Sequence, residues 1–288
     1  MWAALITVYI LWGSTYLGIR IAVQTMPPLL FAGARFVIAG ALLCAWRLPL
    51  AARDGKLPTA RHWLRTLVIG AALLLGGNGG VAIAETTVPS GLTALIVACV
   101  PLWMALVDRV FYGRRMPTAM LGGLIVGFGG VALLVGAPAQ GTVSLAGPLI
   151  LVAASLSWAA GSLYSRGAKL PDDSLLATGM EMLTGGGCLV IAGLIGGEGA
   201  NVHLAAISTA SWIAFVYLVL FGGIVGFSAY LWVIRNAPTT LVSTYAYVNP
   251  VVAVFLGWAI LHENLTLRAA AAGAIIVASV AWIVSSRK

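Results

Sequence analysis

The sequence predicts an all-α integral membrane protein with ten transmembrane helices, arranged as a 5+5 inverted-topology repeat. Three observations predict this fold: a strongly apolar composition, ten apolar runs of spanning length, and an internal repeat. Of the 288 residues, 61% are hydrophobic and only 8% are charged, and the mean hydropathy is +1.02. Because a soluble domain carries about 25% charged residues, we expect lipid rather than water to surround most of this chain.

Ten apolar runs are long enough to cross a bilayer, whose hydrocarbon core of roughly 30 Å needs about 20 helical residues. They cover residues 3–22, 29–48, 64–85, 91–110, 117–136, 145–166, 174–196, 209–234, 239–261 and 266–285. The connections between them are short, so we expect no separate soluble domain. The first run has no basic segment before it, which favours a retained helix over a cleaved signal peptide.

The distribution of basic residues predicts the orientation. If the N-terminus is cytoplasmic, thirteen of the sixteen Lys and Arg fall in cytoplasmic loops or in the C-terminal tail, and only Arg20, Arg35 and Arg268 fall elsewhere. Cytoplasmic loops of membrane proteins are enriched in Lys and Arg, so both termini are predicted to be cytoplasmic. The net charge of +8 then reflects orientation, and we do not expect nucleic acid as a partner.

Two stretches of the sequence recur. LWGSTYLGIR at residues 11–20 matches SWAAGSLYSR at 157–166, with the Trp and the Arg at the same two places. VPSGLTALIVACVPLWMALV at 88–107 aligns without gaps with APTTLVSTYAYVNPVVAVFL at 237–256, and both prolines match. Such matches at nearly constant spacing predict a duplicated unit.

The repeat predicts two homologous halves, residues 1–137 and 145–288. Each half contains five spans, so the second half enters the membrane from the opposite side. Inverted-topology repeats are typical of secondary transporters, whose substrate site lies near the midplane where the halves meet. The repeat therefore favours transport as the function.

Four segments resemble a known family: WGSTYLGIR, NGGVAIAETTVPSG, SWAAGSLYSR, and STYAYVNPVVAVFLGWAILHENLTLRAAAAGAIIVASV. Over essentially its whole length the chain resembles the EamA-type branch of the drug/metabolite transporter superfamily. The resemblance implies ten helices in two halves, a location in the bacterial inner membrane, and efflux of amino acids or related metabolites. Glu263 and Thr266 fit the family pattern after span 9, whereas Arg114 and Pro117 stand at those places in the first half, so the halves have diverged.

Aromatic and polar side chains in spans 1, 3, 6 and 9 are candidates for the wall of a solute cavity. They are Trp12, Thr15, Tyr16, Asn78, Trp158, Ser162, Tyr245, Tyr247 and Asn249. Residues four apart lie on one helix face, which places Trp12 with Tyr16, and the same spacing recurs in span 6. Plain helix packing is the alternative. For Asn249, a hydrogen bond to the carbonyl freed by Pro250 is equally open.

Prolines and glycines mark places where these helices bend or approach closely. Pro101 and Pro250 lie mid-span at equivalent positions, and each removes a backbone hydrogen bond and should kink its helix. Such kinks suit the opposite gates of a transporter; a static bend is the alternative. The glycines around Asn78 allow close helix approach. Spans 5 and 10 are almost purely apolar, and we expect them to be scaffold or a homodimer face.

Four charged residues are candidates for coupling or gating. Arg35 and Glu181 lie inside spans 2 and 7, roughly 10 Å deep, and charges within a membrane usually serve function. Glu181 is a candidate proton carrier, and Arg35 is a candidate for holding a substrate carboxylate or a structural carbonyl. Arg20 and Glu85, near the outer ends of spans 1 and 3, are candidates for an extracellular gate pair.

These patterns predict a secondary active transporter that exports small metabolites, such as amino acids or drug-like amphipathic compounds, by alternating access. The alternative is a passive facilitator or channel. We expect neither an enzyme nor a metal or cofactor site, because HExxH and GxSxG motifs are absent and Cys44, Cys99 and Cys188 lack metal-ligand spacing. The expected partners are a small solute and the lipid bilayer, with a homodimer left open.

Overall fold

The structure is a computed structural model that describes residues 1–113, 118–135, 145–236 and 245–285. Within these residues every regular element is helical. The elements are α1 (Trp2–Ala22), α2 (Pro28–Arg53), α3 (Ala60–Gly70), η1 (Ala71–Gly79), α4 (Gly80–Ala84), α5 (Ser90–Val97), α6 (Val100–Tyr112), α7 (Thr118–Val135), α8 (Ala146–Gly167), α9 (Ser174–Ile195), η2 (Glu198–Asn201), η3 (Leu204–Ala206), α10 (Thr209–Tyr217), η4 (Leu218–Val225), α11 (Gly226–Asn236), α13 (Tyr245–Leu261) and α14 (Leu267–Ser285).

The helices coincide with the apolar runs of the sequence. Among the described residues, seven helical segments are long and apolar enough to cross a membrane, and three shorter apolar helices lie at Leu121–Leu133, Val248–Leu261 and Leu267–Trp282. Each of these segments overlaps one predicted run, so the chain is an all-α integral membrane protein. The count of ten spans and their inverted 5+5 arrangement stay predictions.

Three of the long helices are irregular. The helix from α3 to α4 and the helix from α10 to α11 each contain a π-helical segment, η1 and η4 respectively. The helix of span 4 is interrupted at Ala98–Cys99, between α5 and α6, and Pro101 then lies in the first turn of α6. A missing proline N–H is tolerated there because the first helical turn has no internal acceptor. By contrast, α13 runs through Pro250.

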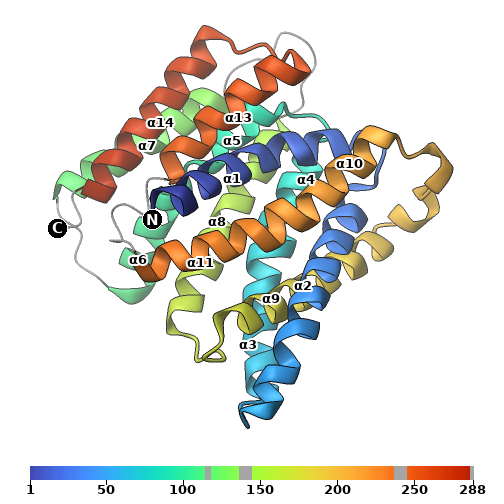
Figure 1. Cartoon of the computed structure of the whole chain (residues 1–288). Helices are drawn as coiled ribbons and strands as arrows, with labels where there is room; N and C mark the ends of the chain where they lie inside the picture. Colours follow the sequence, from blue (N-terminus) through green and yellow to red (C-terminus); the bar gives the residue numbers. More distant parts are fainter. Residues whose placement is uncertain (114–117, 136–144, 237–244, 286–288) are drawn as a thin grey trace.

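Two helix pairs lie at opposite edges of the molecule: α2 packs on α9, and α7 packs on α14 (Figure 1). Helices α1, α5 and α8 lie between these pairs. There α1 packs on α13, while α8 packs on α5 and α6. In addition, α1 contacts α10 and η4, and α8 contacts η1 and α4. The irregular segments are therefore placed against the two central helices, α1 and α8.

Glycines set the close approach of α9 to its neighbours. A Cβ added at Gly40 of α2 would lie 2.7 Å from the carbonyl oxygen of Gly179, and one added at Gly185 would lie 2.6 Å from the carbonyl oxygen of Gly70 in α3. Because ordinary contacts begin near 3.4 Å, the helix backbones touch here. Lipid supplies no hydrophobic force between helices, so van der Waals packing of this kind stabilises their association.

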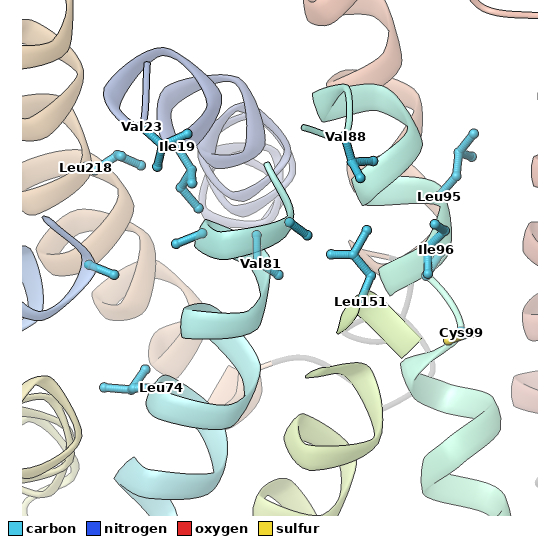
Figure 2. Packing of buried hydrophobic residues seen from close by; sticks show 14 of the residues in the cluster. Ile19, Val23, Leu74, Val81, Val88, Leu95, Ile96, Cys99, Leu151 and Leu218 are labelled. Carbon is cyan, nitrogen blue, oxygen red and sulfur yellow. The ribbon is translucent and has the colours of Figure 1, made fainter. Parts of the chain in front are cut away.

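Aliphatic side chains fill the space among the central helices (Figure 2). The largest buried cluster joins Ile19 of α1, Val81 of α4, Ile96 of α5, Leu151 of α8 and Leu218 of η4. Its members come from both halves of the sequence. The two halves therefore share one core and do not form separate domains.

One end of the helix bundle is held by basic residues, and we refer to it as the basic end. Nε of Arg47 lies 2.6 Å from Oδ2 of Asp173, joining the end of α2 to the start of α9. Nη1 of Arg65 donates to the carbonyl of Lys169 at 2.7 Å. These loops contain the residues that the sequence predicts to be cytoplasmic.

The opposite end is held by two glutamates that cap helices far away in the sequence. The carboxylate of Glu198 accepts from the backbone N–H groups of Leu29 and Leu30, at 3.1 and 2.9 Å. Glu263 accepts from the N–H of Ser90 at 2.7 Å and from its hydroxyl at 3.0 Å. A carboxylate is favourable at a helix N-terminus because the first N–H groups have no helical partner. Loops of the second half thereby hold helices of the first.

Candidate functional site

A cavity of about 170 Å³ lies among the central helices. A single water needs only about 10–15 Å³ of such volume, so the space suits a small solute. Its wall is drawn from both halves of the chain. Ten residues that the sequence singles out line it: Trp12, Thr15, Tyr16, Arg35, Asn78, Pro101, Trp158, Tyr245, Asn249 and Pro250.

One predicted wall residue lies outside the cavity lining, and the side chain of another is not described. Ser162 does not line the cavity, because it lies a helical turn beyond Trp158, towards the basic end; its carbonyl instead accepts the hydroxyl of Ser165 at 2.8 Å. On α8 the cavity lining extends from Trp158 towards the N-terminus of the helix, to Ser155. The side chain of Tyr247 lies outside the described residues.

Each of the two repeated tryptophans lies against a glycine next to or within a π-helical segment. A Cβ at Gly77 would lie 2.8 Å from the Trp158 ring, and a Cβ at Gly226 would lie 2.8 Å from Nε1 of Trp12. Any larger residue would displace the indoles, so these glycines position both rings at the cavity. Gly77 and Gly226 are 149 residues apart, as are the repeated stretches 88–107 and 237–256. The two glycines therefore stand at equivalent places in the sequence repeat.

The Trp12 ring belongs to an aromatic cluster. Its centre lies 5.2 Å from the ring centre of Phe227, 4.7 Å from that of Tyr230 and 5.5 Å from that of Tyr245. Aromatic contacts of this geometry contribute about 0.5–1.5 kcal/mol each beyond their buried area. Sequence reasoning missed Phe227 and Tyr230. Their signal is their position directly after the glycines at 222, 223 and 226.

Polar groups lie on other parts of the wall. Nη2 of Arg35 donates to Oδ1 of Asn78 at 2.9 Å, which joins α2 to η1. Asn249 on α13 is 8% exposed, and its Oδ1 has no hydrogen-bond partner. The hydroxyl of Thr15 is occupied, because it donates to the carbonyl of Trp12 at 2.6 Å. Of these side chains, Arg35 and Asn249 keep polar atoms without a hydrogen-bond partner among the described residues.

The predicted gate and coupling acids lie outside the cavity wall. The guanidinium of Arg20 donates to the backbone carbonyl of Glu85, so its described contact is to the backbone and not to the carboxylate expected from the sequence. Both carboxyl oxygens of Glu85 are buried without a hydrogen-bond partner. Glu181 is half-buried on α9, where its backbone packs against Gly70 of α3. Of the four charged candidates, Arg35 reaches the cavity.

An all-helical membrane protein with an internal polar and aromatic cavity has the architecture of a solute transporter. The model of the EamA-like transporter family matches residues 1–136 and again residues 145–285. The chain therefore belongs to this family, within the drug/metabolite transporter superfamily, and is a membrane transporter whose substrate is a small molecule.

Known relatives agree with this assignment. The chain is 42% identical to the inner membrane transporter YedA of Escherichia coli K12, over 92% of this chain and 84% of the relative. It is 23% identical to an E. coli K12 protein named "Probable amino-acid metabolite efflux pump", over 90% and 86% of the two chains. A crystal structure with 23% identity aligns with a TM-score of 0.63, covering 97% of this chain and 94% of the other, and supports the fold.

Proposed function

We propose that this protein is a secondary active transporter that exports small metabolites, such as amino acids or drug-like amphipathic compounds, by alternating access around the central cavity. The observation that carries the proposal is the composition of the cavity wall. Trp12, Trp158 and Tyr245 offer apolar area, while Arg35 and Asn249 offer polar contacts. Mostly apolar pockets with a few placed polar groups are typical of small-molecule sites. The relative named as an amino-acid metabolite efflux pump supports this solute class.

The packing supports two exchangeable states. If residues 1–137 and 145–288 are inverted repeats, α1 corresponds to α8, and α13 corresponds to α5 together with α6. The packing of α1 on α13 then repeats that of α8 on α5 and α6. A transporter built from inverted repeats changes its exposed side when the two halves exchange conformations. We infer that the inverted 5+5 arrangement of ten spans underlies this exchange, with both termini in the cytoplasm.

We infer further that the two ends of the bundle act as alternate gates. At the end opposite the basic end, Glu198 and Glu263 bind helix N-termini of the other half, and Arg20 binds the chain at Glu85. Opening this end requires these contacts to separate. At the basic end, the ion pair between Arg47 and Asp173 is the contact that has to separate for that end to open. Pro101 and Pro250 on the cavity wall are the proposed hinges, and Glu181 is the proposed proton carrier.

Proteoliposomes containing the purified chain test this function. We expect a radiolabelled amino-acid mixture to accumulate above equilibrium when a proton gradient is imposed, whereas a passive facilitator would only equilibrate it. Trp158→Ala should weaken apparent affinity, and Pro250→Ala should lower turnover more than affinity. Gly129→Ala is a suitable control, because a Cβ there meets nothing within 4 Å. Uptake no faster than that of protein-free liposomes, for amino acids and amphipathic drugs alike, would reject the proposal.

A further inference from the structure

Within the part of the chain that the structure describes, the wall of the cavity carries a single ionic side chain. Among the described lining residues Arg35 is the one cation, and none is acidic. Arg35 is only 5% exposed. A buried guanidinium within a membrane is costly unless an anion or several hydrogen-bond acceptors compensate its charge.

The protein holds this guanidinium in place without neutralising it. Its Nη2 donates to Asn78, and its Cζ lies 4.3 Å from the ring centre of Phe36 and 5.6 Å from that of Phe31. These neutral contacts orient the planar group. In the described part of the chain no carboxylate forms an ion pair with Arg35, and its Nε has no hydrogen-bond partner. Among the described residues only Nη2 of this guanidinium has a hydrogen-bond partner, so the group keeps donors for a ligand.

The buried carboxyl group of Glu85 does not form an ion pair with Arg35 among the described residues. Its two carboxyl oxygens accept no hydrogen bond, and it does not line the cavity. The guanidinium of Arg20 donates to the backbone carbonyl of Glu85. An anion that enters the cavity therefore finds Arg35 unpaired.

The chemistry of the wall favours a carboxylate over a phosphate. A planar guanidinium matches the geometry of a carboxylate, and hydrogen bonds between charged groups are about twice as strong as neutral ones. A doubly charged phosphate ester would bring two negative charges to one cation and leave one uncompensated in a mostly apolar space. In the same cavity, the free Oδ1 of Asn249 accepts a hydrogen bond but donates none.

We propose that Arg35 binds the carboxylate of the transported solute, that Asn78 positions the guanidinium, and that Oδ1 of Asn249 accepts a hydrogen bond from a donor of the same solute, such as an ammonium group. This rests on the proposed function and narrows its solutes to monocarboxylates. The apolar part of the solute packs against Trp12 and Trp158.

Equilibrium binding to the purified full chain in detergent tests the proposal. The probes are L-phenylalanine, L-leucine and L-methionine, each beside its carboxamide, which keeps the ammonium group and the side chain but lacks the carboxylate. We expect titration calorimetry to give at least one amino acid an affinity tenfold or more above that of its amide. Absence of any such preference, including no binding of any probe, overturns the proposal, and so does stronger binding of phenyl phosphate than of 3-phenylpropionate.

Variants of Arg35 test whether this residue causes the preference for the amino acid over its carboxamide. Arg35→Gln should lower amino-acid affinity about ten- to hundredfold, the loss expected for a hydrogen bond to a charged group, and should make acid and amide equal. Arg35→Lys should keep a weaker preference for the acid. Arg268→Gln removes an exposed charge at the start of α14 and should change nothing. A retained tenfold preference in Arg35→Gln overturns the assignment.

A second variant covers the case in which Arg35→Gln does not fold. Asn249→Ala should weaken binding of L-phenylalanine but not of 3-phenylpropionate, which has no ammonium group; equal losses for both overturn the role of Asn249. Proteoliposomes separate this proposal from the function on which it rests. Transport restricted to uncharged or cationic solutes would remove the role of Arg35 and leave the transporter function intact, whereas carboxylate binding without any transport would remove the function alone.

Discussion

The contact between α3 and α9 yields a prediction in which two substitutions, two residues apart on α9, should have opposite effects. A Cβ at Gly185 would lie 2.6 to 2.8 Å from three backbone atoms of Gly70, whereas a Cβ at Gly187 meets nothing within 4 Å. Gly185→Ala therefore requires the two helices to separate by about 0.8 Å before ordinary contact at 3.4 Å is restored. Backbone atoms cannot move aside as a side chain would.

The magnitude follows from two opposing terms. Replacing Gly by Ala inside a helix stabilises it by about 0.8–1 kcal/mol, and this gain applies to both variants. Overpacking a tight contact costs about 1–3 kcal/mol, and this cost applies only to Gly185→Ala. The difference in free energy of unfolding between the variants is therefore the overpacking cost alone. At about 2–4 °C per kcal/mol for a chain of this size class, Gly185→Ala should melt roughly 2–12 °C below Gly187→Ala.

Thermal unfolding in one detergent, followed by tryptophan fluorescence at equal protein concentrations, measures this difference. Size-exclusion chromatography before heating controls for aggregation. Gly187→Ala should melt at or slightly above the unmodified protein. If Gly185→Ala melts as high as Gly187→Ala, the backbone contact between α3 and α9 is not tight, and the reasoning is refuted.

Three further predictions concern the loops and a span. Asp173 caps α9 by accepting from the N–H of Leu175, at 3.0 Å, and pairs with Arg47. Asp173→Asn keeps a capping oxygen and should lower the free energy of unfolding in chemical denaturation by less than about 1 kcal/mol, because the ion pair is partly exposed. Asp173→Ala should lower it by about 1 kcal/mol more, and equal losses in the two variants would contradict the cap. In a cysteine-free background, a membrane-impermeant maleimide added to intact cells should label Leu204→Cys but not Leu57→Cys, both exposed positions; the reverse pattern would invert the proposed orientation. Glu181→Gln should abolish proton-driven accumulation in proteoliposomes yet retain solute exchange, and surviving accumulation would make Glu181 structural.

The sequence alone largely determined where the membrane helices lie. A bilayer demands about 20 apolar residues per helix and offers no partner to backbone groups, so length and composition suffice to find them. The runs predicted at 174–196 and 266–285 correspond to α9 and α14, Ser174–Ile195 and Leu267–Ser285. Residue type also selected most of the aromatic and polar side chains of the cavity wall, because such side chains are few inside apolar helices.

Local spacing could not decide which parts of a helix face the cavity. Ser162 shares a helical face with Trp158 but lies beyond the cavity, while Ser155 lines it. Arg35 and Glu181 are 146 residues apart, as are the repeated Trp12 and Trp158, yet of the two charged residues only Arg35 lines the cavity. A repeat in sequence predicts equivalent positions, but the two halves pack around one shared space, and each position meets different neighbours there.

Only the tertiary structure decided how the site is assembled. The contact between Trp12 and Gly226 and the hydrogen bond from Arg20 to the Glu85 backbone each join two segments far apart in the chain. No pattern within a single helix encodes such contacts, because helix propensity and hydropathy describe a segment against lipid and not against its neighbours. The sequence therefore determined the membrane helices and their residues, and packing between helices decided which of those residues form one cavity.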